Sequence, residues 1–424
     1  MVADTKYPPS VKAGKPILGE TPTSWTRTSL KNHLNLEQRK VKVEDNKEYD
    51  LVTVKRSRGG VVRREHLLGK QISVKSQFRL KEGDFLISKR QIVHGACGIV
   101  PAHLDGSIVS NEYSIFTAKD SFDLIYLRYL SETLYFQQTC FHSSIGVHIE
   151  KMIFKLDNWF KWDFNLPPLL EQRKIVKILS TWDKTIATTE KLIETSKQQK
   201  KSLMQQLLTG KKRLVNPEMS KVFEGDWEDS SIATTSKCFS GGTPSRTKGE
   251  YYGGNIPWIT SGKLNDRFVE SVNEYITESG VSNSSTKYVK QGALLVAMYG
   301  ATAGKVAINR LQSATINQAV LALEVKEMYS NTFLFYLLEK EMEKALSLVQ
   351  GGQPNLNAAI IKGLKIKLPC LKEQQKIASV LTAADKEIEV LEAKLAHFKK
   401  EKRALMQQLL TGKRRVKVDE MEIV

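Results

Sequence analysis

One long segment of this chain occurs twice. Residues 166–213 and 368–415 align without a gap at an offset of 202, and 24 of their 48 positions are identical. Trp25 and Trp227 share this offset, so the repeated unit begins at a tryptophan, ends at a Leu-Leu-Thr-Gly-Lys sequence and covers about half of the protein. Short periods build solenoids, whereas a period this long indicates two large modules in tandem.

The repeated segments have the apolar spacing of coiled-coil helices. Apolar or small residues fall on positions of an alternating three-four spacing. In the first copy these are Ile175, Leu179, Trp182, Ile186, Ile193, Leu203 and Leu207, and in the second Ile377, Leu381, Ala384, Ile388, Leu391, Leu395, Phe398, Leu405 and Leu409. This is the 3.5-residue period of a coiled coil. Pro167 and Pro369 mark the helix starts, and Gly210 and Gly412 mark the ends. Each helix of about 40 residues would be about 60 Å long.

A long helix with a narrow apolar stripe needs a packing partner. The shared heptad favours pairing of the two helices with each other. The alternative is that each helix packs on its own domain. The first helix is polar at Thr189, Ser196 and Lys200, which weakens its apolar stripe in the middle.

The segments before the helices, roughly 26–165 and 227–367, have the patterns of mixed α/β domains. Short apolar runs at 84–87 and 294–297 each follow a glycine turn and predict strands. Helical periodicity marks the stretches Leu124–Leu134 and Phe333–Leu348. The two domains diverge strongly from each other, while the helices are alike. This contrast suggests one frame that presents two different recognition domains.

Composition is that of a soluble globular protein, with 41% hydrophobic and 26% charged residues. The chain shows no signal peptide and no membrane span, which predicts a cytoplasmic protein. Its four cysteines, Cys97, Cys140, Cys238 and Cys370, form no Cys-x-x-Cys pair. Neither a zinc site nor a disulfide framework is expected.

Positive charge is concentrated in residues 55–90. The net charge of the chain is +18, which suggests a polyanionic partner. Within this stretch three acids, Glu65, Glu82 and Asp84, oppose eleven cations: Lys55, Arg56, Arg58, Arg63, Arg64, Lys70, Lys75, Arg79, Lys81, Lys89 and Arg90. The excess favours nucleic acid over a solvated face. Lys55, Arg56, Arg58, Arg63, Arg64, Lys89 and Arg90 are the candidate DNA contacts, with Gly59-Gly60 as a flexible turn that could enter a groove.

A second candidate site lies in the loop 240–268. Its many glycines and prolines, among them Gly241, Gly242, Pro244, Gly249, Gly253, Gly254 and Pro257, argue against a long helix or strand, and cations alternate with aromatic residues along it. Such a loop suits phosphate contact and recognition of base edges. The candidate residues are Arg246, Lys248, Tyr251, Lys263 and Arg267. For Trp258 a role in the core is the better interpretation.

No catalytic constellation is present in the sequence. Residues 300–306 resemble a P-loop but are one residue short and lack the Ser or Thr after Lys305, so a strand–loop–strand turn is expected there. The Asn216–Met219 stretch does not match the motif of amino-methyltransferases, and no glycine-rich S-adenosylmethionine loop is found. The histidines show no metal-ligand spacing, so neither a catalytic residue nor a metal site is assigned.

These motifs together resemble the specificity subunit of type I restriction–modification enzymes. The resemblance rests on the two L-P-x-L-x-E-Q-x-K-I openings, the paired M-Q-Q-L-L-T-G-K ends and the G-G-T-P-S and Y-Y-G-G-x-I-P-W-I sequences of the second domain. It implies an α+β protein with two target recognition domains. Two long helices would join them as an antiparallel coiled coil with pseudo-two-fold symmetry. The expected boundaries are 1–165, 166–213, 214–367 and 368–415, with a tail at 416–424.

The resemblance further implies a protein that is not itself an enzyme. Each domain would recognise one half of a bipartite DNA sequence, and the helices would set the distance between the halves. Two modification subunits would bind the protein and methylate adenine with S-adenosylmethionine, and restriction subunits would cut DNA with ATP, so no cofactor is expected on this chain. The candidate partner contacts are Gln205, Gln206, Gln407 and Gln408, which belong to the repeated helix ends.

Three alternatives remain open from the sequence. One is a self-contained nuclease or methyltransferase, against which the missing motifs argue. Another is a coiled-coil adaptor without a DNA role, against which residues 55–90 argue. The third is a stand-alone DNA-binding protein outside any restriction–modification system.

Overall fold

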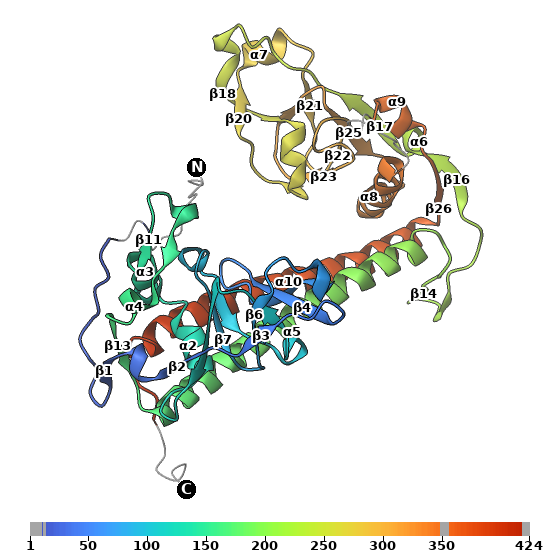
Figure 1. Cartoon of the computed structure of the whole chain (residues 1–424). Helices are drawn as coiled ribbons and strands as arrows, with labels where there is room; N and C mark the ends of the chain where they lie inside the picture. The colour runs from blue at the N-terminus through green and yellow to red at the C-terminus, as the bar shows by residue number, and fades with distance from the viewer. Residues whose placement is uncertain (1–10, 12–13, 348–355, 418–424) are drawn as a thin grey trace. The chain divides into compact units, whose positions relative to one another are not determined.

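The computed structural model describes residues 11, 14–347 and 356–417. The chain forms two compact units, one of residues 1–189 with 394–424 and the other of residues 190–393. The two long helices are α5 (Leu169–Leu207) and α10 (Leu371–Leu409), visible in green and red in Figure 1. Each unit therefore contains one globular domain and about half of each long helix.

The domain of the first unit is built on two sheets. The four-stranded sheet has the order β2-β10-β7-β8, with bounds Leu34–Glu37, Tyr113–Ala118, Phe85–Ser88 and Cys97–Ile99. The five-stranded sheet has the order β3-β6-β9-β4-β5, with bounds Lys40–Lys42, Ser76–Arg79, Ile108–Val109, Glu48–Val54 and Val61–Leu68. Its remaining elements are α2 (Leu124–Leu130), α3 (Leu134–His142), α4 (Leu156–Trp159) and the hairpin of β11 (Ser144–Ile145) and β12 (Ile153–Phe154).

The domain of the second unit also has a five-stranded and a four-stranded sheet. The first has the order β17-β25-β22-β23-β19, with bounds Ser236–Ser240, Val320–Val325, Leu294–Ala297, Val306–Asn309 and Phe268–Val269. The second has the order β20-β18-β24-β21, with bounds Glu274–Ile276, Tyr252–Ile259, Ala314–Ile316 and Lys287–Val289. Its other elements are β14 (Val215–Asn216), β15 (Lys221–Val222), α6 (Ile232–Thr235), α7 (Glu278–Ser282), α8 (Asn331–Ser347) and α9 (Ala358–Lys362).

Most local predictions from the sequence are confirmed. The two apolar runs form β7 and β22, and residues 300–305 connect β22 to β23 as a loop, as expected. The stretch predicted as helical at 124–134 forms α2, which ends at Leu130, and α3 follows from Leu134. The second predicted helix forms α8, while Leu348 lies outside the described residues.

A two-stranded ribbon precedes each long helix in the same register. In the first unit β1 (Thr26–Ser29) pairs with β13 (Asp163–Leu166), with Thr26 opposite Leu166. In the second unit β16 (Glu228–Ser231) pairs with β26 (Lys365–Leu368), with Glu228 opposite Leu368. Both members of the second pair lie 202 residues beyond those of the first, so the repeat seen in the sequence includes this ribbon.

The long helices run antiparallel within each unit. In the first unit the rings of Trp182 (α5) and Phe398 (α10) are 5.9 Å apart, and in the second unit Lys197 pairs with Glu392 at 2.6 Å. In both units residue numbers rise along α5 as they fall along α10. The predicted pairing of the helices is thereby confirmed.

In each unit the helix pair also packs on the globular domain of that unit. The two alternatives from the sequence, pairing of the helices with each other and packing on a domain, therefore both occur. Ile175 and Leu179 of α5, with Leu409 of α10, belong to the aromatic-rich core of the first domain. Ile377 and Leu381 of α10 join the core of the second domain in the same way, together with Leu207 of α5. The heptad stripe is therefore shared between the partner helix and a domain. No helix in the described part of the chain is long and apolar enough to cross a membrane.

Candidate nucleic-acid interface

The same ion pair joins the two long helices in each unit. In the first unit Arg415, just beyond α10, donates to Glu171 near the start of α5 at 2.7 and 2.8 Å. In the second unit Arg213, just beyond α5, donates to Glu373 near the start of α10 at 2.7 and 2.8 Å. Glu171 and Glu373 are both buried. The two bidentate ion pairs occupy equivalent positions of the repeat, 202 residues apart. Each of them joins the end of one long helix to the start of the other.

A second repeated pair lies farther along the helices. Asp183 (α5) accepts hydrogen bonds at 2.6 Å from Lys402 (α10) and from Tyr129 of the first domain. Asp385 (α10) pairs at 2.6 Å with Lys200 (α5) and accepts a hydrogen bond of 2.6 Å from Tyr336 of the second domain. Each aspartate therefore connects the partner helix and a domain.

These contacts lower the pKa of both aspartates. Burial alone would raise the pKa of Asp183, but hydrogen bonds from Lys402 and Tyr129 outweigh it. The pKa of Asp385 is lowered in the same way, because hydrogen bonds from Lys200 and Tyr336 outweigh its burial. Lys200 looked like a weak point of the apolar stripe in the sequence. The structure corrects that interpretation, because Lys200 forms a charged contact between the helices.

Backbone conformation and nearby side chains explain why a glycine follows each long helix. Gly210 and Gly412 both have a φ of +69°, which L side chains rarely adopt. The repeated tryptophans also lie over them, so that a Cβ at Gly210 would be 3.3 Å from Trp227 and one at Gly412 would be 3.4 Å from Trp25. A Cβ at Gly412 would in addition lie 2.3 Å from Pro22. The Leu-Leu-Thr-Gly-Lys sequence thus closes each helix against the start of the other repeat.

The predicted partner contacts lie on the surface at these helix ends. Gln205, Gln206, Gln407 and Gln408 are all exposed, whereas Leu207 and Leu409, which follow them, are buried. In the first unit a groove of about 740 Å³ adjoins Gln407. Apolar residues of this groove include Leu134, Met406 and Leu410, its cations are Lys399, Lys402 and Arg403, and its acids are Glu132 and Asp183.

The β4–β5 turn of the first domain is fixed rather than flexible, which corrects the interpretation of Gly59-Gly60 as a mobile element. The Ser57 and Arg58 amides donate to the carbonyls of His94 and Gly95 at 2.7 and 2.9 Å. Arg58 Nε donates to the carbonyl of Ser131 at 2.9 Å, and Arg56 pairs with Glu150 at 2.7 Å. These contacts hold the turn on the domain, so it presents its cations from a set position.

Acids from other segments face part of the basic stretch. Exposed ion pairs join Arg63 to Asp50 at 2.9 Å and Arg90 to Glu112 at 2.6 Å. Counting charges only within residues 55–90 therefore overstates the local excess. Exposed pairs of this kind contribute little to stability, so their arginines can exchange a carboxylate for a phosphate at little cost.

A β-bulge sets the direction of Arg64. In the register of β4 and β5, Leu51 lies opposite Glu65 and Val52 lies opposite Arg63, which leaves Arg64 as the extra residue. Bulges twist a strand locally and re-aim a side chain. Arg64 and Arg63 are both exposed on this hairpin. Lys55 is exposed, and Lys89 is half-buried with its ammonium on the carbonyl of Asn111 at 2.6 Å.

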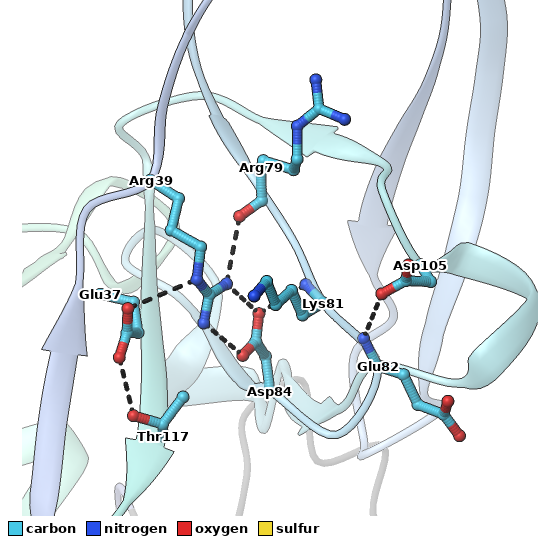
Figure 2. Close-up of polar contacts among 8 residues, drawn as sticks. All are labelled: Glu37, Arg39, Arg79, Lys81, Glu82, Asp84, Asp105 and Thr117. Carbon is cyan, nitrogen blue, oxygen red and sulfur yellow. Dashed lines mark hydrogen bonds and ion pairs between the residues drawn. The ribbon is translucent and has the colours of Figure 1, made fainter.

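A buried ion pair holds the strands beneath this surface together. Arg39 forms two hydrogen bonds with Asp84, at 2.6 and 2.8 Å, and donates to the carbonyl of Arg79 at 3.3 Å. Asp84 is only 2% exposed, and the amide of Lys81 donates to it as well, at 2.7 Å. Figure 2 shows the side chain of Arg79 pointing away from this cluster. The pair thus anchors β6 and β7 from within and leaves Arg79 exposed.

The second candidate loop contains more regular structure than its glycines and prolines suggested. Residues 252–259 form strand β18, and a register shift between Tyr252 and Ile256 absorbs Gly253 and Gly254. The expectation that no long strand forms here was wrong, because a bulge allows a strand to include residues that a regular ladder excludes.

Arg246 is the best-placed cation of this loop. Its guanidinium lies 4.6 Å from the centre of the Tyr252 ring and 5.2 Å from that of Trp258, and it pairs with Glu274 at 2.6 Å. Trp258 is 2% exposed and belongs to the core, as expected. Arg246 is thereby stacked on a rigid base, with more than half of its side chain exposed.

Three other candidates of this loop have contacts within the protein. Arg267 pairs with Asp385 of α10 and lies over the rings of Phe335 and Tyr336 at 4.7 and 5.1 Å. Lys263 pairs with Asp266 at 2.7 Å. Tyr251 is 5% exposed and its hydroxyl accepts a hydrogen bond from Lys248. Burial keeps Tyr251 from stacking on a base, and Arg267 connects the domain to the helix, so we remove both from the interface.

Arg39, Asp183 and Asp385 were not among the residues predicted from the sequence. A signal existed for the two aspartates, because they are identical residues at equivalent positions inside the apolar stripe of a repeat. Nothing local pointed to Arg39, whose partner lies 45 residues away. Within the described residues, no cluster of three His, Cys, Asp or Glu side chains could hold a metal ion.

The comparisons with known proteins agree with this architecture. The family model "Type I restriction modification DNA specificity domain" matches residues 31–198 and 224–399. The chain belongs to this family. Both matches include a domain and the first part of the long helix that follows it, so the repeat consists of two such modules.

A curated relative and two solved structures support the assignment. The MjaVIII specificity subunit of Methanocaldococcus jannaschii, a type I restriction enzyme subunit, is 31% identical over 312 residues, which cover 70% of this chain and 71% of that protein. The HsdS subunit of Thermoanaerobacter tengcongensis is 18% identical with a TM-score of 0.55, covering 93% of this chain and 98% of that one. A chain from a study of complex assembly in a type I R-M system is 17% identical with a TM-score of 0.61, covering 92% and 99%. These two structures share the fold.

This protein is therefore a type I specificity subunit with two target recognition domains. Such subunits recognise DNA and assemble with the other subunits of the restriction–modification system, which carry out the chemistry.

Proposed function

We propose that each target recognition domain of this specificity subunit recognises one half of a bipartite DNA target. The observation that carries the proposal is the contrast between frame and domains. The ribbon, the helix-start ion pair, the interhelical aspartate and the closing glycine recur at an offset of 202. The strands common to the two domains have the same order, but the domains differ in the extra edge strands β3 and β19 and diverge strongly in sequence. A shared frame with divergent domains is suited to two different half-sites.

In the first domain the proposed DNA surface is the β4–β5 hairpin with its neighbours. Arg63 and Arg64 are exposed on β5, and Arg56 and Arg58 hold the turn while they add positive charge. Lys55, Lys89 and Arg90 extend this surface. Most of these cations would contact phosphates, which position the protein on the duplex.

In the second domain the proposed contacts are Arg246 and Lys248, with Lys263 at the edge of the surface. An arginine that is stacked and pre-oriented loses little side-chain entropy on binding, and its fork matches the O6 and N7 atoms of guanine. Glu274 competes for the same guanidinium, so guanine binding would have to replace that ion pair.

The partners proposed for the helix ends are two modification subunits. Gln205 and Gln206 form one exposed copy of the contact, and Gln407 and Gln408 form the other. The partly apolar groove next to Gln407 would receive an amphipathic segment of such a subunit. S-adenosylmethionine and ATP would bind to the modification and restriction subunits, and the complex would act in the cytoplasm.

A domain exchange tests the proposal. Residues 227–367 would be replaced by the equivalent domain of another type I specificity subunit, and the methylated adenines of the host genome would be mapped. One half of the methylated motif should change and the other half should stay. A change in both halves would refute independent recognition.

The mass of the assembled complex tests the stoichiometry. Two modification subunits per specificity subunit are expected, because the exposed glutamine contact is present twice. A complex that stays at one to one under saturating modification subunit would contradict this part of the proposal.

A further inference from the structure

An exposed apolar hairpin adjoins the basic surface of the first domain. Ile145 and Ile153 lie opposite each other in β11 and β12. They are 58% and 36% exposed, and Val147, in the loop between the strands, is 95% exposed. Single exposed apolar side chains are ordinary, but three in one short hairpin indicate a contact surface.

The hairpin is held in place by sterics and by hydrogen bonds. A Cβ at Gly146 would lie 2.9 Å from the Met152 Cα, so the loop closes tightly. The Phe154 amide donates to the carbonyl of Lys89 at 2.9 Å, and the Lys155 amide donates to that of Ser143 at 2.8 Å. The exposed position of Val147 is therefore a fixed feature of the domain.

The same contacts join the hairpin to the proposed DNA surface. Arg56 of the β4–β5 turn pairs with Glu150 of the loop at 2.7 Å. A pocket of about 500 Å³ beside the hairpin is lined by Ile153, by Lys89 and Lys155 and by the carboxylates Glu37, Glu112 and Asp157. Lys151 of the loop is exposed as well. The apolar tip therefore lies next to the cations Arg56, Lys89 and Lys151, a position that suits contact with an apolar group of a polyanion.

The major groove of DNA offers such a group in the C5-methyl of thymine. This methyl distinguishes thymine from the other bases, and proteins recognise it through apolar contact. The side chains that unstack base pairs from the minor groove are Phe, Leu, Ile, Met and Pro, a set that does not include valine. A short β-branched valine fits contact with a methyl group better than insertion between bases.

We propose that Val147 contacts a thymine methyl group in the half-site recognised by the first domain, and that this hairpin is a determinant of sequence specificity. The inference rests on the proposed role of that domain in DNA recognition. A half-site that contains an adenine for methylation necessarily contains a thymine opposite it, so a methyl group is available in such a site.

Paired deletions of methyl groups test this contact. The specificity subunit would be assembled with its modification subunits, and its affinity for the methylated sequence would be measured at constant salt. Each thymine of the first half-site would be replaced in turn by deoxyuridine, which lacks only the methyl group. Val147→Ala would be measured on the same set of duplexes. Val74→Ala, which truncates a 54% exposed valine elsewhere in the domain, serves as the matched control.

One thymine should stand out. Replacing it by deoxyuridine should weaken binding by wild type about fourfold, the equivalent of burying one methylene-sized group. Val147→Ala should bind the unmodified site more weakly to a similar extent and should lose its sensitivity to that replacement. Val74→Ala should keep the wild-type response.

Other outcomes separate this inference from the proposed function. If every deoxyuridine duplex binds wild type normally, Val147 does not contact a thymine methyl. The same conclusion follows if the loss of affinity from deoxyuridine and the loss from Val147→Ala multiply independently when the two changes are combined. If Val147→Ala instead impairs assembly with modification subunits, the hairpin is a protein contact and the inference is wrong. If the assembled wild-type complex shows no preference for the methylated sequence, the proposed function itself fails.

Discussion

At the scale of single residues, the repeat identifies two helix ends at which only glycine fits well. The glycines after the two long helices share a φ of +69° and a tryptophan neighbour, but they differ in the space around them. Gly292 provides a comparison, since its φ is +86° and a Cβ there would meet nothing within 4 Å. Backbone strain and steric clash can therefore be separated with three substitutions.

We expect the stability losses to increase in the order Gly292→Ala, Gly210→Ala, Gly412→Ala. Left-handed backbone should cost each alanine about 1–2 kcal/mol. At Gly412 the clash with Pro22 should add about 1–3 kcal/mol of overpacking. Urea denaturation would measure the free energies of unfolding. Equal losses at the three sites would show that the neighbouring tryptophan and proline move away freely.

Arg246 and Arg267 lie in the same region of sequence but should respond differently to substitution. Arg267→Ala removes a half-buried partner of Asp385 and should lower the free energy of unfolding by about 1–3 kcal/mol. Arg246→Ala should leave the melting temperature nearly unchanged and should weaken specific DNA binding, with a loss of about 1–3 kcal/mol in discrimination at one base pair. Thermal melting and a binding assay on single-substituted duplexes would measure both effects. A stability loss from Arg246→Ala that equals that from Arg267→Ala would contradict this division.

At the scale of elements, polar contacts set the alignment of α5 against α10. Apolar stripes alone allow a helix to slide by a heptad, whereas a buried charge pair penalises each wrong alignment because it leaves charges unpaired. The Asp183–Lys402 and Asp385–Lys200 pairs have this property in the two units.

These aspartates predict a loss of stability in acid. The folded-state pKa of each lies below the ordinary value of 3.8, so the stability they contribute is present above that value and is lost as the pH falls through the lowered pKa. Asp183→Asn should cost about 1 kcal/mol at pH 7, a modest figure because the site is partly exposed.

The difference between wild type and Asp183→Asn should shrink below about pH 4, where the carboxylate of the unfolded chain begins to take up a proton while the folded one is still charged. Denaturation at pH 7 and pH 3 would measure it, with Asp385→Asn as the matched variant in the other unit. A difference that stays constant between the two pH values would show that the carboxylate charge is not what stabilises the helix pair.

The β4–β5 hairpin gives a second prediction at this scale. Substituting both Arg63 and Arg64 by alanine should weaken DNA binding. It should also flatten the slope of log affinity against log salt concentration by about 1–2, because fewer phosphate contacts release fewer counterions when DNA binds. Titrations between 50 and 200 mM salt would measure the slope. Arg27→Ala, an exposed arginine on β1, serves as control. An unchanged slope in a folded double variant would remove the hairpin from the interface.

At the scale of the whole molecule, the length of the helices is the property to test. Each helix has 39 residues. Inserting four residues into both helices at equivalent positions, after Leu192 and after Lys394, would add about 6 Å and slightly more than one full turn to each.

The spacer between the two half-sites should then grow by one or two base pairs, since a base pair rises about 3.4 Å. The half-sites themselves should stay the same. Mapping methylated adenines in cells that carry the variant would measure both. Replacing four residues at each position without changing helix length is the control. An active variant with an unchanged spacer would show that helix length does not set the distance.

The sequence by itself determined the frame of this protein. A gap-free repeat with heptad spacing fixed the two helices, their ends at Gly210 and Gly412 and their pairing, because periodic apolar spacing and terminal glycines act locally. The strands at β7 and β22 followed from equally local signals. Even Asp183 and Asp385 were visible in principle, since the repeat preserves them.

Only the tertiary structure decided which charged residues can reach DNA. Arg246 and Arg267 belong to the same loop, and the sequence does not distinguish their roles. In the structure Arg267 pairs with Asp385, whereas Arg246 is stacked on Tyr252 at the surface. The β4–β5 turn looked mobile until its contacts with His94 and Gly95 were known. Charge and burial of a side chain depend on partners far away in the sequence, such as Asp50, Glu112 and Glu150, and spacing along the chain does not encode which of them will meet.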